Sequence, residues 1–577
     1  MRLLECFSPV FAYGLQLDEQ ARTGAPLEAL APLQARASGM VVEARTASLA
    51  EGKPLPQVEM AAFAAVAWFD EVVMRHDRWK NQGNPLQQRL FRTSEAASEF
   101  FDHLAGLPGD ADEVREVFGM ALLLGFAGQY YYERGDGGEL GRIKALHCRP
   151  SVTAPAILQS LQRDPITPQP YLAPGSPLLR LPGAWASRRA VQRVATLVVW
   201  LVLAAFVGPI FSSAAPAQAW YLAGLAVTVI ALLGWAGALA WHAQVVRRAH
   251  TRVAVSTEAG YGIGDLWATL RDAGRHLRGA LLHPFRRRGE WRRLSRHPWL
   301  IFLGDDPAEV RGLLQAAAHA PHARTSPGQG DARPWYWWVF RAVVAIEPGM
   351  GLLREPGDPR HDESPWMHAL AQLARERRKL PADGMVLCVA AQTLLGTTPS
   401  IEACADRLHA MADAATRRLQ LQLPLYIVVT GMEGLPGYAT FRTTLPSSAF
   451  RRALGCRIGA APGGHHALGR MDVHGEMVIP RMRAAALAAL AVQGQPRGRR
   501  ELFALLQSLP RLQRGLDAFL DRLRAGEARG GRRLAWCGLY VTGGSRAQAP
   551  GGDFADDLFA RFLPADRVLA RRIAPEG

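Results

Sequence analysis

Two long apolar segments near the middle of the chain restrict what it can fold into more than any other feature. Residues 194–211 form a run of 18 residues without a charge, and residues 220–241 form a second run of 22. A helix needs about 20 apolar residues to cross the core of a bilayer, so both segments can span a membrane. Trp220, Tyr221 and Trp241 stand where aromatic side chains meet the bilayer surface. The alternative is a buried helical hairpin inside a soluble domain.

Arginines flank the two segments on their outer sides. The nearest of them are Arg188, Arg189, Arg193, Arg247, Arg248 and Arg252. The connecting residues 212–219 carry no charge. Positively charged flanks stay in the cytoplasm, so we expect both soluble parts there, joined by a hairpin whose short loop faces outside.

The net charge of the chain is strongly positive. Its 577 residues include 67 Lys and Arg against 51 Asp and Glu, a formal charge of +16. Such a charge points to nucleic acid or to an anionic membrane surface. The basic segment 242–296 follows the second span, so anionic lipid head groups explain it more simply, and we expect no nucleic-acid partner. The arginines expected at the membrane surface are Arg247, Arg248, Arg252, Arg286, Arg287, Arg288, Arg292 and Arg293.

The part before the membrane segments predicts a helical domain over residues 1–163 and a Pro-rich linker over 164–190. One predicted helix, residues 60–74, contains the adjacent carboxylates Asp70 and Glu71. Neighbouring side chains on a helix point about 100° apart, so this pair does not predict an acid/base site. We expect structural polar contacts instead.

This domain resembles the DotU/TssL family of type VI secretion systems. The resemblance rests on FAAVAWFDEVVM (63–74), Trp79, residues 88–91 and 99–102, and ALLLGFAGQYYY (121–132). It implies a helical cytoplasmic domain that faces the secretion baseplate. The residues that it marks as structural or partner-binding candidates are Asp70, Glu71, Trp79, Gly125, Phe126, Gly128 and Tyr130.

The part after the membrane segments alternates short β-rich runs with helical stretches. The apolar runs are residues 299–304, 343–346, 385–391, 425–430 and 536–543. Buried strands alternating with helices predict an α/β domain with a doubly wound parallel sheet. We place this GTPase-like domain at 297–450, followed by a helical or α+β subdomain at 451–577.

The loops that would bind nucleotide in such a sheet lack the required chemistry. After Gly304, a phosphate loop would read GxxxxGK[ST], but Glu309, Val310 and Arg311 replace its second glycine, its lysine and its hydroxyl residue. A loop that reads guanine would have [NT]KxD. Here the corresponding residues are Thr430, Gly431, Met432 and Glu433. We therefore expect a pseudo-GTPase with no cofactor and no enzymatic activity.

This second part resembles the cytoplasmic part of the IcmF/TssM family. The matching segments are 298–304, 337–340, 423–430, 435–438, 536–543 and 553–559. The resemblance implies a partner of TssL in the same secretion machine. The resemblance does not extend to the nucleotide-binding positions, so we do not expect the family's nucleotide site in this chain.

The remaining signals are weak. His465, His466, Asp472, His474 and Glu476 form the densest group of possible metal ligands, but they lack a recognised spacing, and we expect no metal. The six cysteines are too scattered for a disulfide framework.

Together these observations predict a structural, oligomeric inner-membrane subunit of a type VI secretion system. Its expected partners are other membrane-complex and baseplate subunits and anionic lipids. The alternatives are a membrane-tethered GTPase or ATPase, and a membrane-anchored adaptor with no role in secretion.

Overall fold

The computed structural model describes residues 1–167 and 297–572 with short gaps. The gaps are at 27, 81–82, 134–137, 318–322, 325–334, 341, 350–351, 353–363, 377–379, 458–477, 531–533, 544–551 and 566–569. Both expected membrane segments, the expected membrane-surface arginines and the histidine cluster lie outside the described residues. Within the described residues, no helix is both long and apolar enough to cross a membrane.

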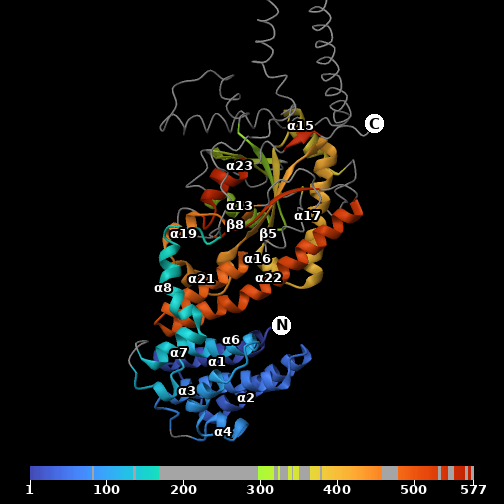
Figure 1. Ribbon diagram of the computed structural model, residues 1–577. Coiled ribbons are helices and arrows are strands. Elements are labelled where there is room, and N and C mark those ends of the chain that lie inside the picture. The colour runs from blue at the N-terminus through green and yellow to red at the C-terminus, as the bar shows by residue number, and fades with distance from the viewer. Residues whose placement is uncertain are drawn as a thin grey trace, which may run out of the picture.

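The N-terminal part is helical, as the sequence predicts (Figure 1). Its elements are α1 (Leu3–Thr23), α2 (Leu30–Ala50), α3 (Leu55–Met74), α4 (Leu86–Phe91), α5 (Ala96–Ala105), α6 (Asp112–Leu123), η1 (Gly128–Tyr130), α7 (Glu139–His147) and α8 (Arg149–Ser160).

Helix α3 is the centre of this helical domain. It packs against α1, α2 and α6, and almost every side chain from Ala61 to Val73 is buried. Helix α1 can approach closely because Gly14 has no side chain. A Cβ at that position would lie 2.4 Å from the Trp68 ring. The all-round apolar sequence of α3 therefore reflects burial on all sides rather than membrane insertion.

The C-terminal part is built on an eight-stranded sheet with the order β2-β3-β4-β1-β5-β7-β9-β8. Its strands are β1 (Trp299–Gly304), β2 (Ala323–Arg324), β3 (Trp335–Val339), β4 (Val344–Pro348), β5 (Gly384–Ala390), β7 (Pro424–Thr430), β8 (Leu454–Arg457) and β9 (Ala535–Val541). The central strands β4, β1, β5, β7 and β9 run parallel, and β2, β3 and β8 run antiparallel to their neighbours.

The expected parallel sheet is thus correct for the centre and wrong at both edges. Strands β3 and β4 are separated only by residues 340–343, and a parallel crossover needs a dozen residues or more, so they pair as a hairpin. At the other edge, β8 and β9 come from the residues expected to form a separate subdomain at 451–577. They complete the same sheet.

Helices cover both faces and one end of the sheet. They are α13 (Pro307–Ala316), α15 (Pro365–Glu376), α16 (Ala391–Leu394), α17 (Thr398–Leu419), α18 (Tyr438–Thr444), α19 (Ser447–Arg451), α21 (Val478–Val492), α22 (Pro496–Gly530) and α23 (Leu563–Ala565). The short turns η4 (Met432–Gly434) and η5 (Leu558–Phe562), and the two-stranded sheet of β6 (Leu421–Gln422) and β10 (Arg571–Arg572), complete the described elements.

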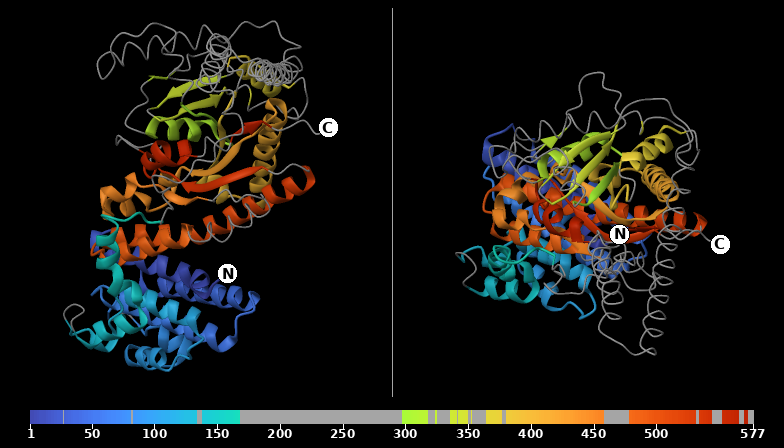
Figure 2. Two further views of the ribbon diagram at one scale, coloured as in Figure 1. Left: turned by 45° about the horizontal axis from the view of Figure 1, so that its top comes forward. Right: turned by 90° about the horizontal axis from the view of Figure 1, so that it is seen from above.

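The helix α22 lies between the sheet and the N-terminal helices. It is the longest described helix, and Figures 1 and 2 show it running across one end of the sheet, with the helices of residues 1–147 on its far side. One continuous cluster of buried apolar side chains extends from α1 and α3 to α22 and to one face of the sheet. The two parts therefore share a core.

Candidate functional site at the carboxyl edge of the sheet

The loop after β1 occupies the place of a phosphate loop, and its acidic side chains bind the protein's own groups. Asp306 accepts the Ala308 N–H (2.8 Å) and caps α13. Asp305 accepts the Ala390 N–H at the end of β5 (3.2 Å) and the Thr393 hydroxyl. The two contacts of Asp305 tie the loop to the end of β5 and to α16.

Glu309 and Val310, in the first turn of α13, also turn into the protein. Val310 is buried beneath the loop, and a Cβ at Gly304 would lie 2.2 Å from its Cγ2. Glu309 is 8% exposed, and its Oε2 lies 2.8 Å from where a Cβ at Gly431 would be. Glu309 therefore reaches across to the loop after β7.

Arg311 forms an ion pair where a GTPase would hold its magnesium ion. Its Nε and Nη2 donate to Glu347 Oε1 (3.1 and 2.7 Å), and Trp338 Nε1–H donates to Glu347 Oε2 (2.9 Å). Glu347 is only 1% exposed. Burial raises the pKa of this carboxyl, and the hydrogen bonds from Arg311 and Trp338 offset part of the rise. One network thus joins α13, β3 and β4.

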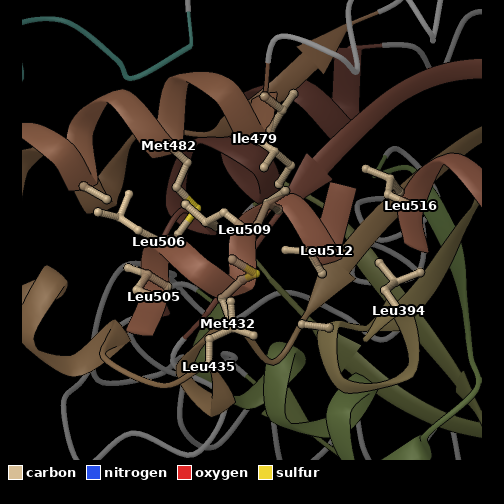
Figure 3. Packing of buried hydrophobic residues seen from close by; sticks show 14 of the residues in the cluster. Leu394, Met432, Leu435, Ile479, Met482, Leu505, Leu506, Leu509, Leu512 and Leu516 are labelled. Carbon is tan, nitrogen blue, oxygen red and sulfur yellow. The ribbon is translucent and has the colours of Figure 1, made fainter. Parts of the chain in front are cut away.

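The loop after β7 faces α22 rather than an open crevice. Gly431 has φ +74°, which a side chain would disfavour, and Glu433 in η4 is half-buried. Met432 is fully buried with Leu435 and with Leu505, Leu509 and Leu512 of α22 (Figure 3). In a GTPase the residue before this methionine, here Gly431, is the lysine of the base-binding loop. That lysine is absent, and the neighbouring Met432 makes an apolar contact with α22.

Helix α22 packs closely onto the carboxyl edge of the sheet. A Cβ at Gly515 would lie 1.9 Å from the Leu394 carbonyl oxygen, so the helix touches the backbone of α16 at a position that only glycine permits. Further along, Arg522 donates to both carboxylate oxygens of Asp406 on α17 (2.9 and 2.6 Å). Ligands of doubly wound folds bind in this crevice, and here a helix fills it.

The opposite side of α22 holds the N-terminal helical domain. Its Arg500, Phe503, Gln507 and Arg514 lie three, four and seven residues apart, which places them on one face of the helix. Phe503 packs against Phe11 with a ring-centroid distance of 6.1 Å. Gln507 donates to the Ser8 carbonyl (3.2 Å).

Among the described residues, three ion pairs join the helical domain to α21 and α22, and all have the same polarity. The acid always belongs to the helical domain and the arginine to the C-terminal part. The pairs are Glu5–Arg514 (2.6 Å), Glu19–Arg500 (2.6 Å) and Glu116–Arg483. Such complementary charge favours one orientation of the two parts over others.

The segment after α8 forms a second attachment. Helix α8 packs along α21, and the Gln162 carbonyl accepts the Ser448 hydroxyl (3.1 Å). Thr167 Oγ1 then accepts the Gly455 N–H of β8 (2.9 Å), which caps a donor on the outer edge of the sheet. Residues 161–167 therefore belong structurally to the C-terminal part.

The adjacent carboxylates on α3 serve two different segments. Asp70 accepts the Leu86 and Gln87 N–H groups at the start of α4 (2.9 and 2.7 Å). Burial raises the pKa of Asp70 to about 6, although these two donors lower it in part. Glu71 points to the turn after α6, where it accepts the Ala127 (3.1 Å) and Gly128 (2.8 Å) N–H groups.

The other residues marked in the N-terminal part surround this turn or support it. Phe126 packs on Phe100 at 4.1 Å between ring centroids, and Tyr130 contacts the edge of Phe101 at 4.8 Å. Gly128 has φ +51°, and a Cβ there would lie 2.4 Å from the Ala97 carbonyl oxygen, so only glycine fits. Trp79 is not part of this turn. It is buried, and its indole N–H donates to the Glu28 carbonyl (3.1 Å).

Gly125 brings this turn to the domain junction. Arg75, at the end of α3, donates to the Gly125 carbonyl and pairs with Glu71. Arg499 of α22 approaches the same glycine. The sequence gives no signal for Arg499 or for the junction arginines, because α22 resembles any amphipathic helix until its partner is known.

Among the described residues, no group of three or more His, Cys, Asp or Glu side chains could hold a metal ion. The six cysteines are free thiols, and five of them are buried.

The Arg311–Glu347 pair generates a stability prediction. Arg311→Met leaves a buried carboxylate without its counter-charge, which costs about 3 kcal/mol of the free energy of unfolding near neutral pH. Adding Glu347→Gln removes that charge and restores most of the loss. Because the folded-state pKa of Glu347 is raised, the single variant gains stability relative to the wild type as the pH falls towards about 5.

Denaturant unfolding of the purified chain near neutral pH and at about pH 5 measures the free energy of unfolding of each variant. The control is Arg142→Ala, which breaks the exposed Arg142–Glu139 pair and should leave stability unchanged. A double variant no more stable than Arg311→Met would show that the ion pair is not the cause.

Comparisons with known proteins agree with the two-part architecture. Residues 2–215 match the family model of type VI secretion system protein DotU, and residues 359–574 match that of the IcmF-related N-terminal domain. The second match begins after β4, so the phosphate-loop position lies outside it.

Type VI secretion system component TssM1 of Pseudomonas aeruginosa is 22% identical over 271 residues, which are 45% of this chain and 24% of that protein. This chain therefore spans about a quarter of the length of that relative. The crystal structure of SciP/TssL from enteroaggregative Escherichia coli 042 is 28% identical and covers 25% of this chain and 87% of its own, with a TM-score of 0.21, which is too low to support a structural argument. The N-terminal part of this chain is thus a DotU/TssL domain and its C-terminal part an IcmF/TssM-related domain, joined in one polypeptide.

Proposed function

We propose that this chain is a structural, non-enzymatic subunit of a type VI secretion membrane complex. It holds a DotU domain and an IcmF-related domain as one docked unit at the cytoplasmic face of the bacterial inner membrane, and this unit anchors baseplate components. The observation that carries the proposal is the domain junction. There an apolar contact and two ion pairs on α22 and one ion pair on α21, all of one polarity, fix the two domains together.

A fixed junction gives a physical reason for joining the domains. Two weak docking surfaces held together act at a high effective concentration, so their joint affinity for a partner exceeds that of either alone. The shared core also sets the orientation of the two surfaces. A partner that contacts both therefore meets a rigid, preorganised platform.

The same geometry argues for a role without nucleotide. Arg311 and Glu347 occupy the magnesium position, and Met432 and α22 occupy the base position. Residues 194–241 would form the membrane hairpin, and the basic residues after it would contact anionic lipids. We propose an oligomer, as expected of a membrane-complex subunit.

Reversing the junction charges tests the role of docking. Glu5→Arg with Glu19→Arg places like charges opposite Arg514 and Arg500, so we expect secretion to fall sharply in a strain lacking the native gene. Adding Arg514→Glu and Arg500→Glu restores opposite charges and should restore secretion. The readout is release of the secretion tube protein into the medium at equal levels of each variant in the membrane.

The matched control exchanges the charges of the exposed Arg142–Glu139 pair, which lies within α7 and does not cross the junction, and should secrete normally. Normal secretion by the reversed variant would show that the docked arrangement is not needed.

A calorimetric titration tests the absence of nucleotide chemistry. We expect no heat of binding for GTP or ATP with magnesium, because a phosphate cradle, a cation and a magnesium ligand are replaced together. Binding in the micromolar range that is lost when Gly304 is substituted would favour a nucleotide-dependent switch instead.

Reporter fusions test the proposed topology. Fusions at Pro170 and at Gly577 should both report the cytoplasm, and a cysteine at Ser213 should react with a reagent that does not cross the membrane. Opposite locations of the two fusions would mean that only one segment spans.

A further inference from the structure

Two arginines from the two domains meet at Gly125. Arg75 follows the last turn of α3, and Arg499 lies in the first turn of α22. A Cβ at Gly125 would lie 3.2 Å from Nη1 of Arg499 and 3.9 Å from Nη1 of Arg75. Because Gly125 has no side chain, both guanidinium groups can approach the same point at the junction.

Hydrogen bonds within the protein fix the position of both guanidinium groups. Arg499 Nε donates to the Gln493 carbonyl (2.7 Å), and Arg75 donates to the Gly125 carbonyl and to Glu71. The Arg75 side chain remains 32% exposed and Arg499 is half-buried, so solvent reaches both residues. Fixed and accessible guanidinium groups are what an oxyanion site requires.

Arg499 differs from the other arginines on α22 that lie near the junction. Arg497, Arg500 and Arg514 each pair with a glutamate, whereas Arg499 forms no ion pair with any carboxylate of the described residues. Of the nearby acids, Glu71 also binds the 127–128 backbone, and Asp18 already pairs with Arg22 and contacts His76 Nε2 (3.1 Å).

More positive than negative side chains therefore surround the Arg499 guanidinium group. Burial lowers its pKa, the positive charges of Arg75 and Arg22 lower it further, and Asp18 offsets only part of this. A cation partly withdrawn from water beside a second cation needs an anion to balance it. Arg75 already pairs with Glu71, but no carboxylate of the described residues pairs with Arg499.

We propose that Arg75 and Arg499 bind a phosphate-class oxyanion dissolved in the cytoplasm, at the junction between the DotU domain and the IcmF-related domain. The planar fork of each guanidinium group matches the oxygens of a phosphate or sulfate group. An anion bound to one arginine from each domain links them directly. Its binding therefore stabilises the docked arrangement and makes docking sensitive to the concentration of the anion.

The test uses the full chain purified in detergent, with inorganic phosphate as the probe and chloride at matched ionic strength as the reference. Phosphate should bind saturably by calorimetry and raise the unfolding temperature above the chloride reference. Sulfate should act similarly, and acetate weakly. Arg499→Gln should weaken phosphate binding about 10- to 100-fold, the equivalent of one lost charge-assisted hydrogen bond.

Arg497→Gln is the matched control, because it removes one arginine from the same turn of α22 whose guanidinium already pairs with Glu501, and it should bind as the wild type does. Arg499→Lys keeps the charge but loses the fork, so it should bind with intermediate affinity. The proposal fails if the wild type shows no effect of phosphate beyond chloride. It also fails if Arg499→Gln and the wild type bind phosphate equally, because the anion would then bind elsewhere.

Discussion

The burial of one leucine-rich face of α22 against the carboxyl edge of the sheet is the contact from which the rest of the arrangement follows. Leu505, Leu509 and Leu512 cover the loop at Met432, and Gly515 lets the helix rest on the backbone of α16. Side chains on opposite faces of an α-helix point in opposite directions. The burial of the leucines therefore turns the row of arginines and Phe503 towards the DotU domain. The DotU domain then docks on a surface whose position is set by the sheet.

This arrangement changes what the crevice of a doubly wound fold is used for. In a nucleotide-binding protein the loops at the carboxyl ends of the strands keep their donors free for a ligand. Here Asp305 and Asp306 bind backbone groups, and Arg311 binds Glu347. The arginine in place of the magnesium-binding hydroxyl and the aspartates of the loop therefore make contacts within the protein, and the edge supports a second domain.

Much of the fold could be predicted from the sequence, because buried parallel strands and long apolar helices have strong local patterns. The five runs that include residues 299–304 and 425–430 all form strands, and residues 1–163 are helical. The edge strands were missed for local reasons. β8 has four residues, and β3 is rich in tryptophan and has no apolar–polar alternation.

The candidate site was harder to predict. The sequence showed that Glu309, Val310 and Arg311 break the phosphate loop, but Glu347 lies 36 positions from Arg311, and nothing local links them. The junction depends on contacts between residues about 370 to 510 positions apart. Single residues such as Glu5 or Arg514 look like ordinary solvated charges until both surfaces are known.

The contact between Thr167 and Gly455 has a consequence for the order in which the protein is made. Thr167 leaves the ribosome 288 residues before the strand whose edge it caps. At about 5–20 residues per second, the DotU domain waits roughly a quarter of a minute to a minute for its docking surface. During that time its Phe11 and the apolar side of α8 have no partner from the later half. The sheet therefore reaches its final form only after both halves have been synthesised.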